Sequence, residues 1–255
     1  MNVDRINVLG VGISTLNMDS AAQAILEAVR QSRRGYVCIT NVHAVMEGYD
    51  DPQVKAALNG AMLCTPDGMP MVWLGHWAGK KEMSRVYGPD LMLRLCADSC
   101  KEGWRHFFYG GANGAALELA AKLKERFPGL VIAGIYEPPF RPLNETEEKA
   151  LIGTVGAARP DFFWVGLSTP KQDKFMADYS PKLDATVMLG VGAAFDFHSG
   201  RIRQAPAWMQ RLGLEWFFRL CMEPRRLWKR YLKHNPRFVY HIVRQQLGLE
   251  RFTLP

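Results

Sequence analysis

Short apolar segments alternate with amphipathic ones along most of the first 200 residues, and this alternation limits the possible folds more than any other feature. Each apolar segment is rich in β-branched or aromatic residues and is followed by a polar or glycine-containing loop and then by a helical pattern. The clearest segments are 36–40, 105–109, 161–167 and 187–191. The pattern predicts an α/β fold with a mostly parallel sheet and helices on both faces.

Polar residues and glycines collect where the predicted strands end. In open α/β sheets, ligands bind at the carboxyl ends of the strands. The loops concerned are Thr40-Asn41, 65–68, 110–114, 168–172 and 192–196. We therefore expect the binding site to be built from these five loops.

The composition changes abruptly after residue 200. Residues 201–255 contain twelve Lys or Arg and three acidic residues, a net charge of +9, whereas residues 1–200 contain 20 basic and 22 acidic residues. Nine aromatic residues lie among the cations of the C-terminal stretch. We therefore predict a body over 1–200 and a basic, aromatic, helical appendage over 201–255.

The mixture of arginines and aromatics in the appendage is typical of an amphipathic helix that lies on an anionic membrane surface. Burial of the aromatics in the core and binding to nucleic acid are the alternatives, but no nucleic-acid motif accompanies the charge. No apolar run reaches the ~20 residues that span a bilayer, and the N-terminus lacks the pattern of a secretory signal. The five cysteines favour a reducing compartment. We expect a cytoplasmic protein that is peripheral on a membrane.

A glycine-rich loop at Gly110, Gly111, Asn113 and Gly114 lies between a predicted strand and a predicted helix. Backbone N–H groups in that position can hold a diphosphate, or the glycines can simply form a tight turn. The spacing is neither that of a dinucleotide fingerprint nor that of a Walker loop. We nevertheless keep an NAD-dependent oxidoreductase that uses this loop as an alternative.

Individual polar residues also allow two interpretations. Asp67, between Pro66 and Gly68, could cap a helix or act as a general base. Gln172 could begin a helix or contact a substrate. His43, His106 and His198 are interpreted as structural histidines and not as catalysts. No His or Cys residues have the spacing of metal ligands, so no metal and no cofactor are expected.

Several longer segments are more specific than these single residues. They are GVGAAFDF at 190–197, APAW at 205–208, GLEW at 213–216, EPRRL at 223–227, TPDG at 65–68 and VGLSTPKQ at 165–172. In these segments, and over essentially its whole length, the chain resembles the WecG/TagA/CpsF family of bacterial glycosyltransferases.

The resemblance implies an inverting, metal-independent transferase with a Rossmann-like body and a membrane-docking C-terminal appendage. Such enzymes move a sugar from a UDP-sugar to a saccharide on a polyprenyl diphosphate, at the inner face of the cytoplasmic membrane, in the synthesis of cell-surface polysaccharides. The sugar is left open between N-acetylmannosamine, its uronic acid and glucose, and so are the acceptor saccharide and a possible homo-oligomer. Nucleic acid is not expected as a partner.

The resemblance also assigns residues. The catalytic base of the family matches Asp67, and Asn41 matches a binding position whose threonine neighbour is replaced by Ile39, with Thr40 beside it. The remaining matches are Arg85 and Gln172 in the active site, and Arg219, Arg226 and Arg230 facing the lipid diphosphate. For the donor we expect residues of two strand-end loops, Gly110, Gly111, Asn113, Gly192 and Asp196. In the implied mechanism Asp67 takes the proton from the acceptor hydroxyl, which attacks the anomeric carbon opposite the leaving UDP.

Overall fold

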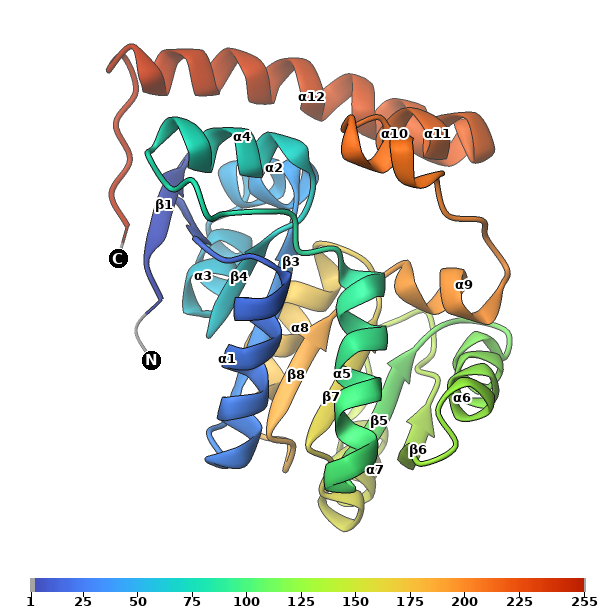
Figure 1. Cartoon of the computed structure of the whole chain (residues 1–255). Helices are drawn as coiled ribbons and strands as arrows, with labels where there is room; N and C mark the ends of the chain where they lie inside the picture. Colours follow the sequence, from blue (N-terminus) through green and yellow to red (C-terminus); the bar gives the residue numbers. More distant parts are fainter. Residues whose placement is uncertain (1–2, 255) are drawn as a thin grey trace. The chain divides into compact units, whose positions relative to one another are not determined.

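The computed structural model describes residues 3–254. Contacts between residues divide the chain into two compact units (Figure 1). The first unit comprises the described residues of Met1–Met18, Ile39–Tyr87 and Arg203–Pro255. The second unit comprises Asp19–Cys38 and Gly88–Ile202.

A six-stranded sheet flanked by helices forms the centre of the fold, with the strand order β4-β3-β8-β7-β5-β6. Its strands are β3 (Gly35–Thr40), β4 (Leu63–Pro66), β5 (Arg105–Gly110), β6 (Val131–Tyr136), β7 (Phe162–Gly166) and β8 (Val187–Gly190). The pairs β3–β8, β8–β7, β7–β5 and β5–β6 are all parallel. The α/β fold with a parallel sheet is therefore confirmed.

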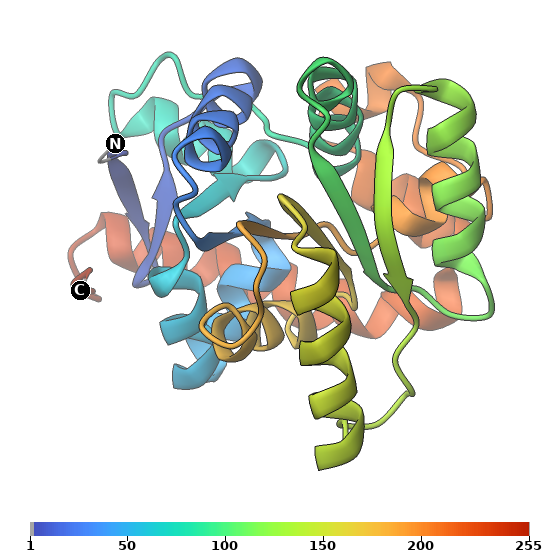
Figure 2. The same cartoon turned by 90° about the horizontal axis from the view of Figure 1, so that it is seen from below.

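The second unit carries helices on both faces of its strands. These helices are α1 (Met18–Arg30), α5 (Gly88–Glu102), α6 (Ala115–Arg126), α7 (Glu145–Ala158), α8 (Lys171–Tyr179) and α9 (Ala194–Ser199). Helices α1 and α5 lie on one face of the strands, and α7 and α8 lie on the other (Figure 2). A capping box begins α7, because the side chains of Asn144 and Glu147 each accept from the other residue's backbone N–H.

Aromatic side chains fill the core of the second unit. Phe107, Phe162 and Trp164 are fully buried on neighbouring strands. His106 is buried among them and accepts a hydrogen bond from Trp164, with 2.9 Å between Nε1 and Nδ1. Burial lowers the pKa of His106 to about 3. This histidine is neutral and structural, as the sequence predicts.

The first unit begins with a hairpin and ends with helices. Strands β1 (Arg5–Val8) and β2 (Val11–Ser14) pair antiparallel in a two-stranded sheet, apart from the six-stranded one. The glycine turn between them permits the tight reversal. The helices of this unit are α2 (Val42–Asp50), α3 (Pro52–Gly60), α4 (Met69–Trp77), α10 (Ala207–Arg211), α11 (Glu215–Met222) and α12 (Pro224–Gln246).

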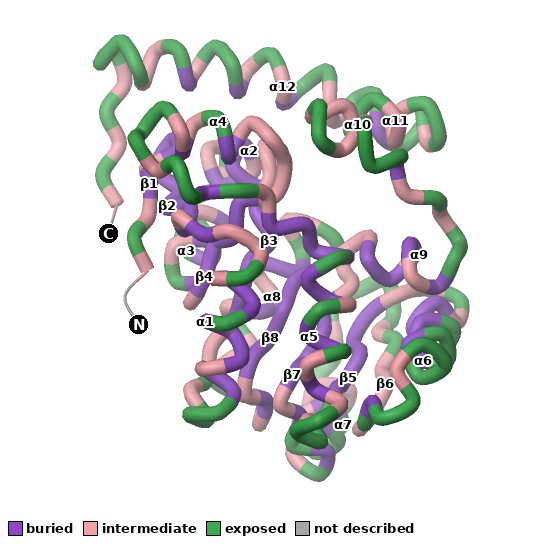
Figure 3. The backbone as a smooth tube through the Cα atoms, viewed as in Figure 1, coloured by how far each residue is buried: buried purple, intermediate pink, exposed green. Residues whose placement is uncertain are grey.

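Helix α12 is amphipathic and packs on α2. Its buried residues Leu227, His234, Phe238 and Ile242 recur at intervals of four or seven, which puts them on one face (Figure 3). The end of the helix and the residues after it are bonded to the N-terminal hairpin, where Asn7 Nδ2 donates to the carbonyl of Phe252 at 2.7 Å. Gln245 Nε2 donates to the carbonyl of Asn7 at 2.8 Å. The C-terminal residues are therefore grouped with N-terminal ones in one unit.

The second unit ends at Ile202, and the residues from Arg203 on are grouped in the first unit with 39–87 and with N-terminal residues. The division into a body over 1–200 and an appendage over 201–255 stays a prediction. Whether residues 1–200 fold without the C-terminal stretch stays a prediction. Over residues 3–254, no helix is both long and apolar enough to cross a membrane.

Candidate functional site

A pocket of about 900 Å³ lies within the first unit. Helix α4 contributes apolar side chains to it, including Trp73 and Trp77, and α12 contributes others, including Phe238 and Ile242. The polar lining consists chiefly of Asn41, His43, Asp67, Arg85, Gln210, Glu215, Arg219, Arg230 and His234. A pocket that combines apolar walls with a few charged groups suits an amphiphilic ligand.

The centre of the polar lining is an ion pair that involves two carboxylates. Arg85 donates from Nε and Nη2 to Asp67 Oδ1, at 3.2 Å for each contact. The same Nη2 donates to Glu215 Oε2 from helix α11. All three side chains are largely buried, with 13–16% of their surface exposed. The Arg85 guanidinium also lies over the ring of Tyr87, with its carbon 4.1 Å from the ring centre.

The backbone fixes the position of Asp67. Strand β4 ends at Pro66, and the Asp67 N–H donates to the carbonyl of Thr40 at 2.8 Å. Gly68 follows with a φ of 94°, which a residue with a side chain rarely adopts, and it is the N-cap of α4. No side chain caps this helix. Asp67 is therefore not the cap of α4, and its carboxylate is available to the pocket.

Asn41 and Thr40 follow β3 but have different environments. Asn41 is the N-cap of α2, where its Oδ1 accepts from the Ala44 N–H at 3.2 Å, and it also lines the pocket. The hydroxyl of Thr40 is buried and lies 2.8 Å from the Cys64 sulfur. Thr40 is not among the residues that line the pocket, but its backbone carbonyl accepts the hydrogen bond from the Asp67 N–H.

The three arginines of the appendage that the resemblance assigns differ in their positions. Arg219 and Arg230 line the pocket. Arg226 does not; its side chain is half exposed, and its Nη2 lies 2.5 Å from a carboxylate oxygen of Glu223. The structure therefore brings two of the three predicted arginines to the same pocket as Asp67.

Burial in this pocket shifts the pKa values of charged groups, among them Glu215 and Arg230. Burial raises the pKa of Glu215, and the Asp67 carboxylate raises it further, while Arg85 opposes both. Burial lowers the pKa of Arg230, and so does the positive charge of Arg219. The Nε of Arg230 has no hydrogen-bond partner among the described residues. An anion bound beside Arg230 would relieve this unfavourable burial of positive charge.

The glycine-rich loop, which lies in the second unit, is a turn whose N–H groups are partly occupied. Gly110 has a φ of 118°, and a Cβ there would lie 2.7 Å from the Gly166 carbonyl oxygen. At the start of α6, the Gly114 and Ala116 N–H groups donate to the Glu137 carboxylate at 3.1 and 3.2 Å. This carboxylate lies where the sequence analysis places a diphosphate. A donor-binding role for Gly110, Gly111 and Asn113 stays a prediction.

Three other predicted residues, Gln172, Gly192 and Asp196, belong to the second unit, and the first two lie next to each other. Gln172 is buried, and its Nε2 donates to the carbonyl of Gly190 at 3.0 Å. Its Oε1 is buried, has no hydrogen-bond partner within residues 3–254, and faces Gly192, where a Cβ would lie 3.3 Å away. Asp196 is in the first turn of α9, and its backbone carbonyl accepts from the Arg201 N–H at 3.0 Å. The substrate contacts of all three residues stay predictions.

Three residues that line the pocket are not predicted from the sequence: Gln210, Glu215 and His234. Glu215 and Arg85 are 130 positions apart in the chain, so no local pattern links them. One signal was nevertheless present, because Glu215 is one of only three acids in a strongly basic stretch. An acid in such a stretch needs a specific partner, and here the partner is the arginine that holds Asp67.

Comparison of the sequence with known proteins shows what this chain is similar to. The sequence model of the glycosyl transferase WecG/TagA/CpsF family matches residues 6–252. An N-acetylglucosaminyldiphosphoundecaprenol N-acetyl-beta-D-mannosaminyltransferase of Bacillus spizizenii is 31% identical over 216 residues, which cover 85% of this chain and 81% of the relative. A protein of the same name from Bacillus subtilis is 30% identical over 196 residues, which cover 76% and 73% respectively.

Proposed function

Because this chain belongs to the glycosyl transferase WecG/TagA/CpsF family, we propose that it transfers a sugar from a UDP-sugar to a saccharide carried on a polyprenyl diphosphate. The transfer inverts the anomeric carbon and uses no metal ion. The two Bacillus relatives are named for an acceptor of this kind and for N-acetylmannosamine as the transferred sugar. N-acetylmannosamine, its uronic acid and glucose are the sugars to be tested.

The observation that carries the proposal is the position of Asp67 in a pocket that also contains arginines and apolar walls. Asp67 accepts the proton of the acceptor hydroxyl as that oxygen bonds to the anomeric carbon. The bond from the anomeric carbon to the UDP oxygen breaks, and UDP leaves with the electron pair. Arg85 holds one oxygen of Asp67, so the other oxygen can point to the acceptor.

The same pocket suits the other parts of the acceptor. A diphosphate binds best to arginines, which can donate two parallel hydrogen bonds to its oxygens. Arg219 and Arg230 are in the position to do so. The apolar side chains of α4 and α12 offer a surface for the first isoprenoid units, because burial of such a chain is favourable. In the donor site we include Gly192 and Asp196, with the loop at Gly110, and we keep Gln172 as a substrate contact.

We further propose that the protein acts at the inner face of the cytoplasmic membrane. Of the large apolar side chains that are exposed among the described residues, all but Leu117, Val131 and Phe140 lie in the first unit. They concentrate on α4 and α10 to α12, in the same unit as the twelve cations of residues 201–255, except Arg201. Exposed aromatics next to cations favour binding to an anionic lipid surface.

Two measurements test the proposal. A panel of UDP-sugars is assayed against a synthetic polyprenyl-diphosphate saccharide, and product formation with inverted anomeric configuration is the expected result. In parallel, calorimetry compares UDP, NAD and a short DNA duplex as ligands. We expect saturable binding of UDP alone. Binding of NAD with indifference to UDP would instead indicate an oxidoreductase, and tight binding of DNA would indicate a nucleic-acid partner.

A further inference from the structure

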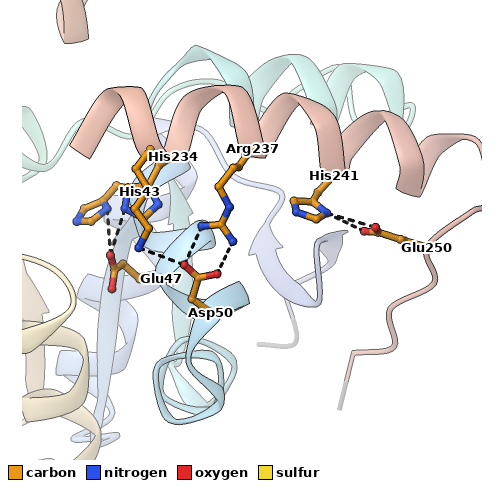
Figure 4. Close-up of polar contacts among 8 residues, drawn as sticks. His43, Glu47, Asp50, His234, Arg237, His241 and Glu250 are labelled. Atoms are coloured by element: carbon orange, nitrogen blue, oxygen red, sulfur yellow. Dashed lines mark hydrogen bonds and ion pairs between the residues drawn. The ribbon is translucent and has the colours of Figure 1, made fainter. Parts of the chain in front are cut away.

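Two histidines and one glutamate meet where helix α12 packs on helix α2. His43 and Glu47 lie one turn apart on α2, and His234 reaches them from α12 (Figure 4). One ligand atom from each residue lies within 4.8 Å of the other two. Within residues 3–254 this is the one group of three His, Cys or acidic residues that meets this condition.

The distances in this cluster are those of metal ligands. Glu47 Oε1 lies 3.6 Å from His43 Nδ1 and 3.4 Å from His234 Nε2. Both distances exceed the ~2.7–3.2 Å of a good N–H···O hydrogen bond. Around a tetrahedral Zn²⁺ with bonds of about 2.0–2.2 Å, neighbouring ligand atoms are about 3.3–3.6 Å apart. The two contacts therefore leave the space that a central ion needs.

Two of the cations near the cluster are paired with another carboxylate. Asp50 pairs with Arg237 at 2.6 Å (Figure 4) and with Lys233 at 3.5 Å. Glu47 is then the carboxylate that remains for an ion.

We propose that His43, Glu47 and His234 form a Zn²⁺ site that fastens α12 to α2. Two imidazoles and one carboxylate are a ligand set that zinc accepts, with a fourth position for water. Both histidines line the pocket described above, so the ion would stabilise one wall of it. Asp67 is not among the ligands, so the site is separate from the proposed proton transfer and does not depend on the proposed function.

The test is a zinc titration of the full chain without an affinity tag, after treatment with a chelator and dialysis. Calorimetry compares the wild type with His234→Gln and Glu47→Gln. The matched control is His241→Gln, because His241 is also on α12 and also contacts a carboxylate, Glu250 at 3.1 Å, without a second imidazole (Figure 4). We expect one zinc per wild-type and control chain, and an affinity more than about 100-fold weaker in the other two variants.

Two further measurements make the result independent of folding defects. Zinc at about 100 times its dissociation constant should raise the Tm of the wild type by roughly 5–10 °C and leave that of His234→Gln unchanged. If His234→Gln does not fold, His43→Gln replaces it in the comparison. In crystals, anomalous scattering at the zinc edge should place the ion about 2.0–2.1 Å from both imidazoles.

Three outcomes would overturn the proposal. The wild type could fail to bind zinc stoichiometrically, the His234 and His241 variants could bind it equally well, or the ion could be found elsewhere. A Tm that depends on pH but not on zinc would leave the cluster as a histidine–carboxylate contact only.

Discussion

Asp67 and Glu215 share the guanidinium of Arg85, although Asp67 follows strand β4 and Glu215 comes from helix α11. Arg85 contacts one oxygen of Asp67 in a largely buried place and so orients the carboxylate that we propose as the base. It also couples the C-terminal helices to the residue on which the proposed chemistry depends.

The first prediction concerns the base itself. Asp67→Asn keeps the shape of the side chain but cannot accept the proton, so kcat should fall by roughly 10²–10⁴-fold. The binding of UDP and the Tm should change little. Single-turnover assays with and without EDTA, on both forms, provide the measurement, and we expect no effect of EDTA on the chemical step. Near-normal turnover of the variant would mean that another residue is the base.

The second prediction concerns Glu215 as a positioning residue. Glu215→Gln removes a charged partner of Arg85, so Arg85 should hold Asp67 less firmly and kcat should fall about 10- to 100-fold with little change in the KM for the acceptor. The matched control is Glu223→Gln, because Glu223 pairs with the half-exposed Arg226 outside the pocket.

A double-mutant cycle distinguishes this role from a purely structural one. If Glu215 acts through Arg85 and Asp67, then Glu215→Gln should cost much less activity in the Asp67→Asn background than in the wild type. Additive losses, or equal losses in the two glutamate variants, would exclude the positioning role.

The third prediction distinguishes Arg230 from Arg226 as a contact of the lipid diphosphate. Arg230→Gln should raise the KM for the lipid-diphosphate acceptor about 10-fold or more, because a charge-assisted contact is lost. Arg226→Gln should change it little, since Arg226 pairs with Glu223 and does not line the pocket. The Tm of Arg230→Gln should not fall, because its buried positive charge is removed. KM measured with the lipid-linked acceptor, next to KM for the UDP-sugar, decides between the two residues.

Much of this arrangement follows from local sequence, and part of it does not. The strands, the loop at Asp67 and the capping box of α7 are set by patterns within about ten residues, which sequence reasoning can detect. Thr40 shows where such reasoning is incomplete. Its position after a strand suggests a site residue, but its hydroxyl is buried against Cys64. The direction of one side chain depends on neighbours that the local pattern does not name.

Contacts between distant segments account for the residues that were missed. His234 meets His43 and Glu47, and Glu215 meets Arg85, only after the chain has folded. The same holds for Gln245, which bonds to Asn7 near the opposite end of the sequence. The charge change at residue 200 shows that the C-terminal stretch is distinct, but it contains no information about where that stretch packs.

The fourth prediction is a pH dependence that arises from Asp173 in the second unit. Asp173 is fully buried, and burial raises its pKa to about 6 from 3.8. Because the folded pKa is above the unfolded one, the contribution to stability is complete below pH ~4 and is lost as the pH rises through ~6. A shift of about two pKa units corresponds to ~3 kcal/mol.

Asp173→Asn removes this titration. Between pH 4.5 and 7.5, the free energy of unfolding of the wild type should therefore fall by about 2 kcal/mol relative to that of the variant, because part of the ~3 kcal/mol is already lost below pH 4.5. Asp178→Asn, which changes an exposed residue of the same helix, is the control and should follow the wild type. Denaturant titrations at several pH values measure the difference. Parallel curves for all three proteins would show that Asp173 does not titrate in this range.

The last prediction concerns the membrane. Trp77 on α4 and Trp228 on α12 are 78% and 48% exposed in the first unit, whereas Phe140 is 89% exposed in the second. If the first unit docks on lipid, burial of each tryptophan should contribute about 1.5–3 kcal/mol, so Trp77→Ser or Trp228→Ser should weaken binding at least about tenfold. Phe140→Ser is the control and should bind like the wild type.

Flotation of the full chain with anionic liposomes, at low and high salt, measures this binding. We expect attachment that weakens as salt rises, because cations of residues 201–255 would each contribute about 1 kcal/mol near an anionic leaflet. Neutral liposomes should bind the protein poorly. Equal flotation of the tryptophan variants and the wild type, or attachment that is independent of salt, would show that α4 and α12 do not form the lipid-binding surface.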